Sequence, residues 1–83
     1  MTDQADIKGM ATTLGSVLFR DYMPDRDCFV VTKLKQAGVI FIGKATLGEL
    51  GGGATHGTLF GPTRNVYDPE RTAGGSSGGS GAS

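Results

Sequence analysis

Glycine is spread unevenly along this chain, and its distribution limits what the second half can fold into. Ten of the 15 glycines lie in residues 51–83 and five lie in residues 1–50. Glycine loses more conformational freedom on folding than any other residue, so it is unfavourable inside helices and strands. A loop of this length without elements of its own is usually functional or disordered. We therefore expect regular structure in residues 1–50, a glycine-rich loop in residues 51–83, and a chain that is part of something larger.

A helix followed by a strand is predicted in residues 27–43. Apolar side chains recur at the spacing of one helical face, at Val30, Val31, Leu34 and Ala37. Asp25 or Asp27 is placed to cap the N-terminus of this helix, and Gly38 stands where a C-terminal cap is wanted. Residues 44–50 are compatible with a second, short helix.

The predicted strand is residues 39–42, with the sequence Val-Ile-Phe-Ile. Four consecutive large apolar residues, three of them β-branched, are typical of a strand buried on both faces. A helix, a glycine and a buried strand make half of an α/β crossover unit. The chain offers no second convincing strand. The predicted fold class is therefore α/β, with a core that has to be completed from elsewhere.

Composition and charge exclude several classes of protein. Eight basic and eight acidic residues give zero formal net charge, so no basic patch points to nucleic acid. No apolar run reaches the roughly 18 residues of a membrane span, and the N-terminus lacks the basic-then-apolar pattern of a signal peptide. The single cysteine, Cys28, excludes an internal disulfide. We expect a cytoplasmic protein with no evident membrane or nucleic-acid partner.

Three isolated side chains are candidates for chemistry. His56 is the only histidine and has no cysteine at metal-ligand spacing, so no metal site is predicted and a structural hydrogen bond is the better interpretation. Cys28 lies near a predicted helix N-terminus, which favours a reactive thiolate, but its apolar neighbours favour a packing role. Lys44 follows the predicted strand, a common place for functional groups in α/β folds, and is a candidate base or anion anchor.

The run Gly-Gly-Ser-Ser-Gly-Gly-Ser at residues 74–80 (the glycine–serine run) has three interpretations when taken alone. It could hold catalytic hydroxyls, cradle an anion on backbone N–H groups, or flex as an artificial linker. It contains no lysine, so it is not a P-loop. No strand is predicted before it, so it is not the nucleophile elbow of the α/β-hydrolases.

The motifs before this run occur in a specific order. They are Gly43-Lys44, Glu49, Phe60-Gly61-Pro62-Thr63-Arg64-Asn65 and Asp68-Pro69-Glu70-Arg71-Thr72. In this order, and followed by the glycine–serine run, they resemble the amidase signature family. The resemblance covers residues 3–83, and the Gly-Gly-Ser-Ser-Gly-Gly core is specific in this context, which disfavours the linker interpretation.

The resemblance implies a fold and a reaction. The family fold is α/β, a large mixed β-sheet sandwiched between helices, and residues 1–83 would be a partial amidase signature domain. Members of the family hydrolyse carbon–nitrogen amide bonds through a serine acyl-enzyme, or pass ammonia from one amide to another acceptor. They use a Ser–Ser–Lys triad and need no cofactor, and the implied substrate is a small amide. The oligomeric state is left open.

The resemblance also implies site residues. By match, Ser76 is the bridging serine of the triad, which follows a cis peptide bond and relays protons. Ser77 is its neighbour and not the nucleophile. Leu50, Gly51 and Gly52 fall where family members line the substrate pocket.

Two members of the triad have no counterpart in this chain. Thr2 stands where the family has its catalytic lysine, and by match Lys44 is not that lysine. The nucleophilic serine of the family lies further along than Ser83. The sequence therefore indicates an internal fragment of an amidase that is inactive as this chain alone.

Three alternatives remain open at the level of sequence. The first is a fragment of the amidase subunit of a tRNA-dependent amidotransferase, which would need partner subunits and tRNA. The second is a non-enzymatic remnant. The third is a small binding module with a synthetic tail, which would require residues 1–73 to fold by themselves.

Overall fold

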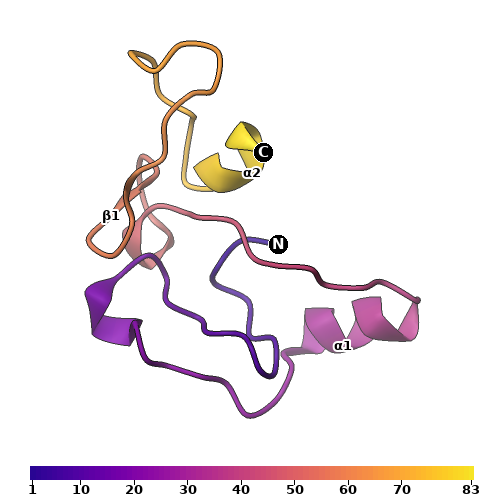
Figure 1. The fold of residues 1–83 in the computed structure, drawn as a ribbon. Coiled ribbons are helices and arrows are strands. Elements are labelled where there is room, and N and C mark those ends of the chain that lie inside the picture. Colours follow the sequence, from indigo (N-terminus) through magenta and orange to yellow (C-terminus); the bar gives the residue numbers. More distant parts are fainter.

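The computed structural model describes residues 1–83, and short elements in it are joined by long extended segments (Figure 1). In chain order the elements are η1 (Val17–Phe19), α1 (Phe29–Gln36), η2 (Glu49–Gly51), β1 (His56–Gly57), β2 (Gly61–Pro62) and α2 (Gly78–Ala82). The two strands form an antiparallel hairpin in which His56 pairs with Pro62 and Gly57 with Gly61. In Figure 1 the helix α1 and this hairpin lie on opposite sides of the molecule.

The predicted helix is present as α1, but its N-terminal cap is not the predicted one. Cys28 is the N-cap residue, and no side chain caps the helix. The carboxylate of Asp27 instead accepts hydrogen bonds from the Lys8 backbone N–H at 2.7 Å and the Lys35 ammonium at 2.8 Å. These contacts hold the pKa of Asp27 below its usual range, and the hydrogen bond from Lys35 has the largest effect. Asp27 therefore ties α1 to an earlier turn instead of capping it.

The predicted end of α1 is confirmed. Gly38 has φ +93°, its N–H donates to the Lys35 carbonyl at 3.0 Å, and the Val39 N–H donates to the Leu34 carbonyl at 3.0 Å. These two bonds define a Schellman motif, which needs a residue in the left-handed region, and glycine adopts that region without a Cβ penalty.

The predicted buried strand at residues 39–42 is wrong for this chain. The segment is extended but pairs with no other strand, and Val39, Ile40 and Ile42 are 42%, 84% and 96% exposed. The physical reason is that a strand buried on both faces needs strands on either side and layers above and below. Residues 1–83 supply none of these here.

The short helix predicted at residues 44–50 is also wrong, because only its end forms the 3₁₀ turn η2. Residues 44–48 (the central segment) run extended next to the N-terminus instead. A parallel bridge joins Thr2 to Ala45. The Ala45 N–H donates to the Met1 carbonyl at 2.8 Å, and the Asp3 N–H donates to the Ala45 carbonyl at 2.9 Å. Pairing with the N-terminus therefore replaces local helix formation in residues 44–48.

The core is small for the length of the chain. Only three large apolar side chains are buried, those of Ile7, Val31 and Leu47. Many other large apolar side chains are exposed to solvent. The radius of gyration is 13.1 Å, more than the about 12 Å of a globular domain of this length. No helix in the structure has the length and apolar character that a membrane crossing requires.

Candidate functional site

The glycine–serine run is a fixed turn rather than a free tail. The peptide bond between Gly75 and Ser76 is cis, as the family resemblance implies for the bridging serine. The Ser76 carbonyl accepts a hydrogen bond from the Gly48 N–H at 2.6 Å. Ser76 is half-buried and Ser77 is exposed, and α2 begins at the next residue, Gly78.

The Thr55 side chain has more hydrogen-bond contacts with the glycine–serine run than any other side chain. It is 5% exposed, and its hydroxyl accepts a hydrogen bond from the Gly78 N–H at 2.8 Å. The same Oγ1 lies 3.0 Å from the Gly74 carbonyl and 3.3 Å from the Ser76 carbonyl, to which it can donate its proton. One hydroxyl therefore joins both sides of the turn that carries Ser76.

Three glycines of the run have neighbours too close for a side chain, and a Cβ at Gly79 would lie 2.4 Å from the Thr46 backbone nitrogen. A Cβ at Gly75 would lie 2.2 Å from the Gly53 carbonyl oxygen, and a Cβ at Gly78 would lie 2.1 Å from the Thr55 Oγ1. All three distances are far shorter than any van der Waals contact. Gly75 and Gly78 have no room for a side chain because the backbone approaches residues 53–55 this closely, and Gly79 has none because it approaches Thr46.

The central segment connects the glycine–serine run to the N-terminus. On one side Ala45 pairs with Thr2. On the other side the Gly79 N–H donates to the Thr46 carbonyl at 3.0 Å, and the Gly48 N–H donates to the Ser76 carbonyl. Thr2, the position at which the resemblance implies a lysine, is thus separated from the glycine–serine run only by the central segment.

The ammonium of Lys44 takes part in a largely buried hydrogen-bond network. It donates to the Ala11 carbonyl and the Thr12 hydroxyl, both at 2.7 Å, and pairs with the Asp3 carboxylate at 3.3 Å. The side chains of Lys44 and Asp3 are 8% and 9% exposed. The other oxygen of Asp3 accepts from the backbone N–H and the hydroxyl of Thr13. The three donors of the ammonium all have partners, so Lys44 acts here as a structural cation.

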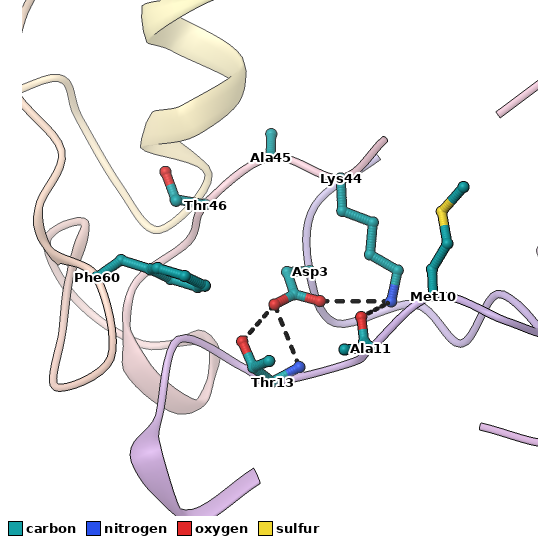
Figure 2. A pocket seen from close by; sticks show the side chains of 8 residues that line it. All are labelled: Asp3, Met10, Ala11, Thr13, Lys44, Ala45, Thr46 and Phe60. Carbon is teal, nitrogen blue, oxygen red and sulfur yellow. Dashed lines mark hydrogen bonds and ion pairs between the residues drawn. The ribbon is translucent and has the colours of Figure 1, made fainter. Parts of the chain in front are cut away.

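A cavity of about 380 Å³ lies beside this network (Figure 2). Its walls come from three parts of the chain: the N-terminal segment, the central segment and the turn before β2. The lining residues are Asp3, Met10, Ala11, Thr13, Lys44, Ala45, Thr46 and Phe60. Figure 2 shows the Lys44 and Asp3 side chains directed toward each other and in direct contact in its wall, so these charged groups neutralise one another.

The turn η2 contains two of the three residues predicted to line a substrate pocket. Leu50 has φ +56°, is 60% exposed and donates its N–H to the Leu14 carbonyl at 2.9 Å. Gly51 donates to the Gly48 carbonyl at 2.8 Å. Gly52 follows as the cap of the turn. Because Gly48 also contacts the Ser76 carbonyl, these three residues and Ser76 belong to one local cluster.

Glu49 fixes the position of η2. Its carboxylate accepts a hydrogen bond from the Thr58 hydroxyl at 2.6 Å, and that hydroxyl accepts from the Val17 N–H at 3.1 Å. Hydrogen bonds from the hydroxyls of Thr58 and then Ser16 hold the pKa of Glu49 below its usual range.

Of the other sequence candidates, Cys28 lies outside this cluster, whereas His56 is close enough to Glu49 to act on its carboxylate electrostatically. Cys28 is half-buried at the start of α1. His56 is exposed in β1. His, Cys, Asp and Glu side chains do not gather in threes anywhere in the structure, so no set of metal ligands is present.

Sequence reasoning missed Thr55, Asp3 and Glu49 as organising residues. Each carries a polar side chain in a stretch without periodicity, where a pattern of apolar residues gives no information. Only Glu49 had an indication in the sequence, because it is itself one of the family motifs.

The chain belongs to the amidase family, because the family model described as Amidase matches residues 2–83. It is similar to a subunit of the Glutamyl-tRNA(Gln) amidotransferase of Sulfurisphaera tokodaii, with 51% identity over 81 residues, which are 96% of this chain and 17% of the relative. The crystal structure of the same subunit from Thermotoga maritima (the Thermotoga subunit) is 45% identical, with a TM-score of 0.89 over 98% of this chain and 18% of that one. The chain thus spans less than a fifth of the length of these relatives.

Proposed function

We propose that residues 1–83 are a partial amidase signature domain of an enzyme that hydrolyses carbon–nitrogen amide bonds through a serine acyl-enzyme. The complete domain is an α/β fold with a large mixed β-sheet between helices. The observation that carries the proposal is the half-buried Ser76 in the glycine–serine run, whose carbonyl accepts a hydrogen bond from the central segment.

In this proposal Ser76 relays a proton between a lysine and a nucleophilic serine. A serine hydroxyl is a poor nucleophile until a base removes its proton, and a neutral lysine can act as that base. A second hydroxyl between them accepts the proton from one and passes it to the other. The pairing of Thr2 with Ala45 and the contacts of Thr46 and Gly48 with the run support a place for the lysine at position 2.

The turn at Leu50, Gly51 and Gly52 lines the pocket for a small amide in this proposal. Its connection to Ser76 through Gly48 supports that assignment. Thr2 cannot act as the base, and no serine of this chain matches the nucleophile. We therefore propose that the chain by itself does not hydrolyse amides.

The second candidate function is that of the amidase subunit of a tRNA-dependent amidotransferase. It is favoured by the curated relatives, which are named as subunits of Glutamyl-tRNA(Gln) amidotransferase. Such a protein would release ammonia from glutamine and work with partner subunits. Glutamine-dependent ammonia release separates this function from that of a free amidase, which would prefer a simple aromatic amide.

The experiment uses a hybrid enzyme, in which residues 2–83 of this chain replace the matched segment of the Thermotoga subunit. The substitution Thr2→Lys is added, and ammonia release is measured from glutamine and from an aromatic amide. We expect Ser76→Ala to abolish release and Ser77→Ala, a matched control one residue away, to retain most of it. Equal activity of the Ser76→Ala and Ser77→Ala hybrids would refute the proposed role of Ser76.

A further inference from the structure

The hydroxyl of Thr55 has more partners in the glycine–serine run than any other side chain. It accepts from the Gly78 N–H at 2.8 Å and lies within hydrogen-bond distance of the carbonyls of Gly74 and Ser76. A hydroxyl has one proton to donate and two lone pairs that can accept, so here one lone pair accepts from the Gly78 N–H and the single proton is shared between the two carbonyls.

The surroundings of this hydroxyl are tight. Thr55 is 5% exposed, and a Cβ at Gly78 would collide with its Oγ1 and lie 2.5 Å from its Cβ. The backbone of Thr55 also contacts the run, since its N–H lies 3.4 Å from the Gly74 carbonyl. The Thr55 carbonyl in turn accepts from the Thr63 N–H at 2.9 Å, next to β2. Thr55 is therefore held from the hairpin side and holds the run on the other side.

We infer that Thr55 is a positioning residue, which sets the orientation of Ser76 for proton transfer without touching the substrate. This inference rests on the proposed function of Ser76. The backbone sets where the Cβ of a relay serine lies and from which point its hydroxyl extends, and here the Ser76 carbonyl is bonded by Thr55 and by Gly48. A displacement of about 1 Å at reacting groups lowers a rate by about a hundredfold.

The test compares Thr55→Val with Thr55→Ser in the Thr2→Lys hybrid enzyme. Valine keeps the shape of threonine and loses the hydroxyl, whereas serine keeps the hydroxyl and loses a methyl group. We expect Thr55→Val to lower kcat about ten- to hundredfold with little change in KM, and Thr55→Ser to stay within about threefold of the parent. Thr63→Val, which removes a hydroxyl bonded only to the Thr46 hydroxyl, is the control and is expected to leave kcat near the parent value.

A second measurement does not depend on activity. Hydrogen exchange of the peptide that covers residues 74–83 is followed by mass spectrometry in the same hybrids. Thr55→Val removes the acceptor of the Gly78 N–H, so exchange of this peptide speeds up, and Thr55→Ser keeps it slow. Thr63→Val leaves it unchanged.

Two results would overturn the inference. One is a Thr55→Val hybrid with the kcat and the exchange rate of the parent, and the other is a Thr55→Ser hybrid that loses as much activity as Thr55→Val. Failure of the proposed function is recognised separately, because an active Ser76→Ala hybrid contradicts the role of Ser76 whatever Thr55 does. In that case the exchange measurement still decides whether the hydroxyl holds the run.

Discussion

Single polar residues, rather than apolar ones, hold this chain together around the proposed site. Asp3, Lys44 and Thr55 are buried or nearly so and each joins segments distant in sequence. Every buried side-chain nitrogen and oxygen has a hydrogen-bond partner. A buried polar group that loses its partner is expensive, so substitutions at these residues have large and specific effects.

Lys44 and Asp3 give a prediction for stability. Lys44→Met leaves the buried carboxylate of Asp3 without its cation, which costs about 3–5 kcal/mol of unfolding free energy. Urea unfolding of the hybrid enzyme measures this loss. The double variant Asp3→Leu with Lys44→Met removes both charges and is expected to recover part of the stability. A double variant that is less stable than Lys44→Met would contradict this account of the pair.

Glu49 gives a prediction for pH dependence. Its folded-state pKa lies below the unfolded value because the hydroxyls of Thr58 and Ser16 donate to the carboxylate. Its contribution to stability is therefore present above the unfolded-state pKa and is lost as the pH falls through the folded-state pKa. Urea midpoints measured from about pH 6 to about pH 3, which brackets an ordinary glutamate pKa, are expected to fall less steeply for Glu49→Gln. Glu70→Gln, which removes an exposed carboxylate, should keep the slope of the parent, and a Glu49→Gln slope equal to it would refute the prediction.

At the scale of elements, α1 was predictable from the sequence and the segment after it was not. The apolar spacing and Gly38 report on local geometry, so they place the helix and its end correctly. The strand at residues 39–42 depends on neighbours that residues 1–83 do not provide, and Ile42 is 96% exposed as a result. The cap was missed because the Asp27 carboxylate accepts from the Lys8 backbone N–H and the Lys35 ammonium instead. The candidate site was proposed from motif order alone, and contacts such as those of Thr55 could not be predicted because they have no periodic signature.

The glycine–serine run gives a prediction at this scale. Gly75→Ala places a Cβ 2.2 Å from the Gly53 carbonyl oxygen, so the turn that carries Ser76 has to move. We expect the Thr2→Lys hybrid with Gly75→Ala to lose at least about a hundredfold in kcat. Gly43→Ala is the matched control, because a Cβ there meets nothing within 4 Å. Equal losses from the two substitutions would show that the close approach is not the cause.

At the scale of the whole molecule, the chain exposes the apolar surface that a larger protein would cover. Three large apolar side chains are buried, whereas Phe29, Ile40, Ile42 and others are mostly exposed. The relatives are more than five times as long and match over this whole segment. This exposed surface supports the proposal that residues 1–83 are part of a larger amidase domain.

The isolated 83-residue chain is expected to unfold without cooperativity. So small a core cannot offset the conformational entropy of ordering the chain, which is about 1–2 kcal/mol per residue for the backbone. Thermal unfolding followed by circular dichroism should show a gradual change, and an environment-sensitive hydrophobic dye should bind at low temperature. A sharp transition with an unfolding enthalpy of about 0.7 kcal/mol per residue would instead show a self-sufficient domain.

We propose that position 2 and Ser76 belong to one catalytic site, joined by the central segment. The most direct measurement is the rate of ammonia release by the hybrid enzyme with and without Thr2→Lys. We predict no release above the Ser76→Ala background with threonine at position 2, and release that depends on Ser76 once Thr2→Lys is introduced. Equal release from both hybrids, or none from either while the unaltered Thermotoga subunit is active in the same assay, would contradict the claim.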